Sequence, residues 1–173
     1  PFEQLPPGVA SYRIVDKLGD ERITDEKLEE AATLALCWSR AWNGGGAHGT
    51  VFAVKPAQVS KSAQTGEYVG KGAFIVRGQR QWFKDLDVQM AVGLVAINGV
   101  PLLLGGTVST IKERCERYAV LSPGRIKKET LANRIYKATG LRTDDILSIL
   151  PGPSEIIEDI GIFSPFRQET EEE

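Results

Sequence analysis

The sequence predicts an α/β or α+β fold, in which a mixed β-sheet is packed by helices in a single domain that ends in short C-terminal helices. The chain has 173 residues, 42% of them hydrophobic and 25% charged, which suits one globular domain with a sizeable core. Segments with the periodicity of strands and of helices alternate, but without the strict rhythm of a parallel βαβ sheet. The apolar runs are far shorter than the roughly 18 residues of a membrane-spanning helix, so we expect no membrane association.

The N-terminal part is expected to form a strand over residues 9–16 and then a long helix. Thr24 is a suitable N-cap, because Asp25 and Glu26 follow it at the positive end of the helix dipole. Apolar side chains then recur every three or four residues, which predicts a helix face that packs on the sheet and carries both tryptophans into the core. This stripe consists of Leu28, Ala31, Ala32, Ala35, Trp38 and Trp42.

The middle of the chain is expected to form short strands and one hairpin. Residues 50–55 and 72–77 are predicted strands, joined by a polar loop. Residues 87–97 and 100–104 are predicted to pair, because the Asn-Gly dipeptide at 98–99 favours a two-residue turn.

The C-terminal part is expected to contain helices around one more strand. A helix should begin near Thr107, followed by a strand over 117–121 and an amphipathic helix over 127–138. Thr143 and Ser154 are each suited to cap a short helix. Two interpretations of the helix start at Thr107 stay open: its hydroxyl groups cap the helix, or its free N–H groups bind an external anion such as phosphate.

Cysteine and histidine are too scarce for several classes of site. Cys37 and Cys115 are far apart and form no CxxC pair, so we expect both to be reduced and buried. Together with His48 they cannot supply the four ligands of a zinc site, and His48 lies in a glycine-rich loop without an evident partner. We expect no metal, no cofactor and no catalytic residue. An enzyme that uses Glu67 or Cys115 is the weakest alternative, because the spacing assembles no nucleophile, base and oxyanion donor.

Charge is strongly segregated along the chain, although the totals of 21 basic and 23 acidic residues leave a net charge of only −2. Residues 16–30 hold seven acids and three bases, a net charge of −4, and residues 144–173 hold nine acids and one base, a net of −8. Residues 55–84 hold six bases and one acid, and residues 110–137 hold eight bases and three acids, so each has a net charge of +5. The local potential of such basic segments suits nucleic acid.

The segment 55–84 interleaves its bases with aromatic residues. Lysine and arginine side chains contact phosphates, while exposed aromatic rings stack on unpaired bases. Phe74 lies within a predicted strand and is expected in the core, whereas Glu67 is expected to orient a neighbouring lysine. The second basic segment places two lysines at a helix start, where they oppose the positive end of the helix dipole. This placement suggests that an external anion binds there. The predicted RNA-binding residues are Lys61, Lys71, Arg77, Arg80, Lys84, Lys127, Lys128, Tyr68 and Trp82.

One block of this segment resembles a known family. The block VSKSAQTGEYVGKGAFIVRGQRQWF contains VSK, GEY, KG and RG in the order and spacing of the NFACT-R (RNA-binding) domain of the NFACT, or fibronectin-binding-protein-A-like, proteins. The upstream EEAATLALCWSRAW looks like the helix before that block in the family. The downstream GGTVSTIKERCERYAVLSPGRIKKETLANRIY is similar to the archaeal versions, and the resemblance covers about residues 8–152.

The resemblance implies a cytoplasmic role in ribosome-associated quality control. The family binds a large ribosomal subunit that holds a stalled peptidyl-tRNA, and it helps to recruit tRNA for a C-terminal tail that is added without a template. The implied partners are tRNA, rRNA or the large subunit, and the remaining NFACT domains in cis or in trans, while the R domain itself contributes RNA contacts and no chemistry.

Family motifs that usually precede this block, and an initiator Met, are missing, so we expect a C-terminal part of a longer protein. Within it we expect an RNA-binding domain over 1–164 and an acidic tail over 165–173. The competing hypothesis is a protein-interaction module that docks a partner through the acidic tail and the helix bearing Trp38 and Trp42.

Overall fold

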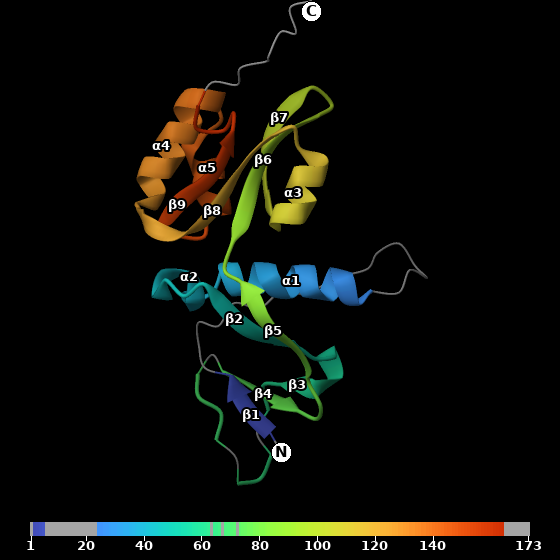
Figure 1. The fold of residues 1–173 in the computed structure, drawn as a ribbon. Helices are drawn as coiled ribbons and strands as arrows, with labels where there is room; N and C mark the ends of the chain where they lie inside the picture. Colours follow the sequence, from blue (N-terminus) through green and yellow to red (C-terminus); the bar gives the residue numbers. More distant parts are fainter. Residues whose placement is uncertain (1, 6–23, 63, 67, 72, 165–173) are drawn as a thin grey trace, which may run out of the picture.

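The fold is that of a computed structural model, which describes residues 2–5, 24–62, 64–66, 68–71 and 73–164 (Figure 1). The strand expected over residues 9–16 lies outside the described residues, as does the acidic tail. The elements form two units that lie one above the other in Figure 1, and the strand leaving the lower unit continues directly into the upper one.

The lower unit contains two small antiparallel sheets beside two helices. One sheet has the strand order β1-β4-β3, and the other pairs β2 with β5. The elements are β1 (Phe2–Leu5), α1 (Asp25–Cys37), α2 (Arg40–Gly44), β2 (His48–Ala53), the 3-10 helix η1 (Pro56–Gln58), β3 (Val59–Ser60), β4 (Phe74–Arg77) and β5 (Gln81–Asp87).

Helix α1 begins where the sequence predicts, but it ends earlier. The Thr24 hydroxyl oxygen accepts a hydrogen bond from the Lys27 N–H at 3.3 Å, so Thr24 is the N-cap. The single helix expected as far as Trp42 is wrong, because the chain breaks at Ser39 and starts α2. The Ser39 hydroxyl accepts from the Ala41 N–H at 3.1 Å and donates to the Leu36 carbonyl at 2.7 Å, so one short side chain both ends α1 and caps α2.

The upper unit is one four-stranded antiparallel sheet with helices on both faces. Its strand order is β7-β6-β8-β9. The predicted hairpin is confirmed, since Asn98 and Gly99 have φ values of 52° and 78° and join β6 to β7. The elements are β6 (Met90–Ile97), β7 (Val100–Gly106), α3 (Val108–Arg114), β8 (Arg117–Ile126), α4 (Lys128–Thr139), α5 (Thr143–Ile149) and β9 (Ser154–Ile160).

Two expectations for the C-terminal half are wrong. Strand β8 does not end at its Pro-Gly pair but runs on to Ile126, and its register with β9 shifts at Pro123. Gly124 permits this pairing, because a Cβ atom there would collide with the backbone of Glu155. Ser154 begins the strand β9 instead of capping a helix, and its hydroxyl donates to the Gly152 carbonyl at 2.8 Å. The short helix expected at Thr143 is confirmed as α5, but Thr143 is its first residue and Arg142 is the N-cap, so the capping role expected for Thr143 is wrong.

A shared hydrophobic core joins the two units, so the predicted α+β single domain is confirmed, with every pairing among the described strands antiparallel. Leu36 and Trp42 of the lower unit belong to the same buried cluster as Met90 and Leu121 of the upper sheet. The Trp42 indole is 1% exposed, and its Nε1–H donates to the Pro153 carbonyl at 2.8 Å. The core position predicted for this tryptophan is therefore confirmed, and its ring offers no surface for a partner.

The start of α3 is tied to α1 by a carboxylate. Thr107 and Thr110 both donate a hydroxyl hydrogen bond to Oε1 of Glu30, the first at 3.1 Å. Negative charge near a helix N-terminus is stabilising. The Thr107 hydroxyl makes no capping hydrogen bond to the helix, so the interpretation as a side-chain cap is wrong. The structure instead places an internal carboxylate, that of Glu30, where the other interpretation expected an external anion. Among the described residues, no helix combines the length and the apolar character needed to cross a bilayer.

Candidate nucleic-acid interface

Strand β5 carries two of the predicted RNA-binding residues, Trp82 and Lys84, on one face because they are two positions apart in the strand, and it contains a bulge just after them. Gly49 and Val51 on β2 face Leu86 and Phe83 on β5, so the one residue between them on β2 lies opposite two residues of β5. Asp85 sits in the bulge with a φ of 55°. Phe83 and Leu86 consequently both pack into the core, while Trp82 and Lys84 remain exposed.

The exposed indole of Trp82 is held in place by its neighbour across the ribbon. Phe52 faces Trp82 in the register, and their ring centroids are 5.2 Å apart at an interplanar angle of 64°, an edge-to-face arrangement. The guanidinium carbon of Arg80 lies 5.1 Å from the centroid of the Phe52 ring. We call Phe52 and Trp82, with Arg80 over Phe52, the Phe52–Trp82 platform.

The neighbouring sheet adds a second cation–aromatic contact. Lys61 follows β3, and its Nζ lies 5.1 Å from the centroid of the Phe74 ring. Phe74 is half-buried and does not belong to the buried core, so the core position expected for it is wrong, and its ring supports a basic side chain instead. Lys71 is exposed in the loop before β4, and Arg77 ends that strand half-buried. The loop also presents the ring of Tyr68, which is 85% exposed, whereas Glu67 lies outside the described residues and its orienting role stays a prediction.

The two remaining predicted cations lie in the other unit. Lys127 is the N-cap residue of α4 and is exposed, and Lys128 is the first residue of the helix and half-buried. In Figure 1, α4 belongs to the upper unit, whereas β3, β4 and β5 lie in the lower one. The structure thus gathers five of the seven predicted cations and both predicted aromatic residues on the lower unit, and it separates two lysines from them.

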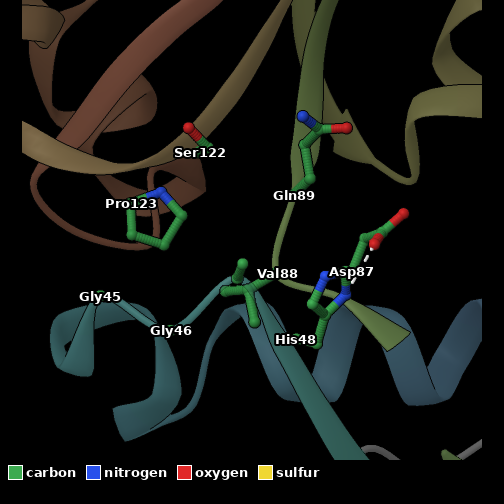
Figure 2. Close-up of a pocket in the computed structure, with 9 residues that line it drawn as sticks. Gly45, Gly46, His48, Asp87, Val88, Gln89, Ser122 and Pro123 are labelled. Carbon is green, nitrogen blue, oxygen red and sulfur yellow. Dashed lines mark ion pairs between the residues drawn. The ribbon is translucent and has the colours of Figure 1, made fainter. Parts of the chain in front are cut away.

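A pocket of about 320 Å³ lies at the junction of the two units (Figure 2). His48 belongs to β2 instead of a loop, and its Nδ1 lies 3.0 Å from the Asp87 carboxylate, so the expectation that it lacks a partner is wrong. These residues are 39 positions apart, and no pattern in the sequence indicated the pair. The pocket is lined by Gly45, Gly46, Ala47, His48, Asp87, Val88, Gln89, Ser122 and Pro123.

Both cysteines are free and buried, which confirms the prediction for them. Burial raises the pKa of the Cys37 thiol to about 11, and its Sγ–H donates to the Gln89 carbonyl at 3.4 Å. Burial likewise raises the pKa of Cys115. A thiol must lose its proton to act as a nucleophile, so neither side chain is suited to that role. Among the described residues, no group of three His, Cys, Asp or Glu could hold a metal ion.

Both thiols are expected to resist alkylation in the folded protein. At pH 8 the Cys37 thiol, with a pKa near 11, is ionised in only about one molecule in a thousand, the pKa of Cys115 is also raised by burial, and burial blocks access to both. Iodoacetamide followed by mass spectrometry should therefore modify Cys37 and Cys115 only in denaturant. Rapid modification of Cys115 without denaturant would contradict this expectation and would favour the enzyme alternative.

Comparisons with known proteins point to one family. Residues 8–78 match the family described as "NFACT protein RNA binding domain". The chain is 32% identical over 155 residues to the "Archaeal Rqc2 homolog aRqcH" of Methanocaldococcus jannaschii. The aligned region covers 86% of this chain and 23% of that protein. It is 42% identical over 83 residues to the human "Ribosome quality control complex subunit NEMF" and 33% over 88 residues to the Drosophila melanogaster homolog.

The human match covers 48% of this chain and 8% of NEMF, and the Drosophila match covers 51% and 9%. This chain thus spans about a quarter of the archaeal relative and less than a tenth of the animal ones. No solved structure is significantly similar to this fold. The matched region contains α1, β2 and β4, together with the segment that brings Lys61, Lys71 and Tyr68 to the lower unit. The predicted resemblance is therefore confirmed: residues 8–78 match the NFACT RNA-binding domain family.

Proposed function

We propose that this chain binds RNA through the exposed basic and aromatic residues of the lower unit. The observation that carries the proposal is the Phe52–Trp82 platform with Lys84 beside it. Phe52 lies within the residues that match the NFACT RNA-binding family, and Arg80, Trp82 and Lys84 follow shortly after the matched region ends at residue 78. Phosphate contacts from lysine and arginine supply most of the affinity in RNA binding, and exposed rings add stacking. The binding is non-catalytic.

The proposed setting is ribosome quality control, in the cytoplasm. The relatives are named for that process, and we infer that the chain contributes RNA contacts to it as one part of a larger assembly. The proposed ligands are tRNA and the rRNA of the large ribosomal subunit, and the remaining NFACT domains are proposed to act with the chain in cis or in trans. Residues 1–164 are proposed to form the RNA-binding domain and residues 165–173 an acidic tail outside it.

Binding to tRNA is expected to weaken several-fold for each doubling of the salt concentration. If about four phosphates are neutralised, the slope of log K against log salt is about −3, which corresponds to roughly an eightfold loss per doubling. Fluorescence anisotropy with labelled tRNA between 50 and 200 mM KCl measures the slope.

The double variant Lys71→Ala with Lys84→Ala tests the site. It removes two exposed cations and leaves Arg80 on the Phe52 ring, so the platform stays intact. The slope should become shallower by about 1.4, and affinity should fall. Unchanged slope and affinity would contradict this assignment of the interface, and absence of tRNA and large-subunit binding by the unaltered protein would contradict the proposed function.

A further inference from the structure

The Phe52–Trp82 platform holds an indole ring rigidly while leaving it open to solvent. Trp82 is fixed at its backbone by the β2–β5 ladder and at its ring by the edge-to-face contact with Phe52. Its exposed fraction is nevertheless 51%, although Trp42 in the same unit is 1% exposed. A large ring that is held rigidly but left open to solvent loses little conformational freedom when a flat ligand stacks on it.

The charges around the ring favour a nucleic acid as that flat ligand. Lys84 lies two residues along the same exposed face of β5, and the guanidinium of Arg80 covers Phe52. Asp85 in the bulge is the acid next to Lys84, and Asp87 at the end of the strand is paired with His48. Arg80 is half-buried with its Nε and Nη2 atoms buried, so the exposed Lys84 is the cation that can contact a phosphate next to a stacked base.

We propose that Trp82 is a stacking site for an unpaired RNA base, so that the lower unit selects single-stranded segments such as loops and chain ends over duplex. This inference rests on the proposed RNA-binding function and specifies its ligand. A base inside a duplex has both faces covered by its neighbours, and side chains contact A-form duplexes mainly through phosphates and 2′-hydroxyl groups. Lys84 binds phosphate in either form of RNA, whereas the Trp82 ring gains a partner only when a base is free.

The experiment compares one RNA in two forms. A fluorescently labelled 12-nucleotide RNA is titrated with the 173-residue chain, first alone and then annealed to its complement, at one salt concentration. Base–aromatic stacking is worth about 5- to 100-fold in affinity. Trp82→Ala should therefore weaken binding of the single strand by about that factor and binding of the duplex by less than about twofold. Trp82→Phe should retain part of the preference, because it keeps a ring.

Tyr136→Ala is the matched control, since this ring is 50% exposed but lies on α4 in the upper unit. It should leave both affinities unchanged, and thermal melting should show that all three variants are folded. A direct signal is the quenching of tryptophan fluorescence by the single strand, which should be reduced in Trp82→Phe because Trp42 is buried in the core and Trp38 is partly buried against it.

The outcomes separate the two proposals. If the unaltered chain binds both RNAs and Trp82→Ala weakens them equally or not at all, the stacking site is overturned while the RNA-binding function stands. If the unaltered chain binds neither RNA nor tRNA, the proposed function fails and the stacking site fails with it. If Trp82→Ala binds both RNAs as tightly as the unaltered chain, the assignment of the exposed ring to RNA is overturned. A contact with a protein partner would then be the remaining role for the ring.

Discussion

Replacing Trp42 with alanine is expected to lower the free energy of unfolding by about 3–5 kcal/mol. The indole is 1% exposed and lies in the cluster that joins α1 and α2 to the upper sheet, so its removal leaves a cavity between the two units. The carbonyl of Pro153 also loses the hydrogen bond that it accepts from the Trp42 Nε1–H at 2.8 Å. Urea denaturation followed by circular dichroism measures the loss as a lower midpoint.

Two variants calibrate this result. Trp42→Phe keeps a ring but not the donor, so it should destabilise the fold by less than the alanine variant. Trp82→Ala removes the same side-chain type from a half-exposed position and should cost much less. Equal losses at Trp42 and Trp82 would contradict the packing described for α2, because they would mean that the two indoles are equally buried.

Reversing two charges on the lower unit is expected to weaken tRNA binding by about tenfold or more at 100 mM salt, because two attractive phosphate contacts become repulsive. The variant is Lys61→Glu with Lys84→Glu, which places one change on each of the two sheets of the lower unit. The pair Lys127→Glu with Lys128→Glu should have a smaller effect, since these lysines lie in the upper unit, away from the Phe52–Trp82 platform. Anisotropy with labelled tRNA compares the two.

The control for net charge is Lys137→Glu with Arg142→Glu, which makes the same change at exposed positions outside the predicted site. It should alter binding only slightly. Acids at the start of α4 favour the helix, so a loss of binding in the Lys127 and Lys128 variant would not come from unfolding. If that variant lost more affinity than the pair on the lower unit, the principal RNA-binding surface would lie on the upper unit instead.

Local signals in the sequence predicted the elements that are determined by neighbouring residues. Thr24 caps α1, and the Asn-Gly turn joins β6 to β7, because caps and tight turns depend on a few adjacent residues. Strand β5 was missed, since the bulge at Asp85 interrupts the alternation by which a strand is predicted. Ser154 was assigned to a helix because an isolated serine is suited to cap one, whereas pairing with β8 makes it the start of β9.

The candidate site shows the same division. The basic and aromatic composition of residues 55–84, and the family resemblance, identified the residues of the lower unit from the sequence alone. Composition did not distinguish the exposed Trp82 from its neighbour Phe83, which packs against the core, because exposure depends on which strand pairs with which. It also did not show that Glu30 of α1 supplies the anion at the start of α3, a contact across 77 positions.

By itself the sequence determined the α+β class, the core position of Trp42, the buried thiols and the family to which residues 8–78 are matched. These properties follow from hydrophobic periodicity, residue type and short motifs, which act over a few neighbouring residues. Only the tertiary structure decided that five predicted cations share one unit while Lys127 and Lys128 lie in the other, and that Trp82 faces solvent. Those properties depend on antiparallel pairing between distant segments, in which one bulged residue changes the face on which every following side chain lies.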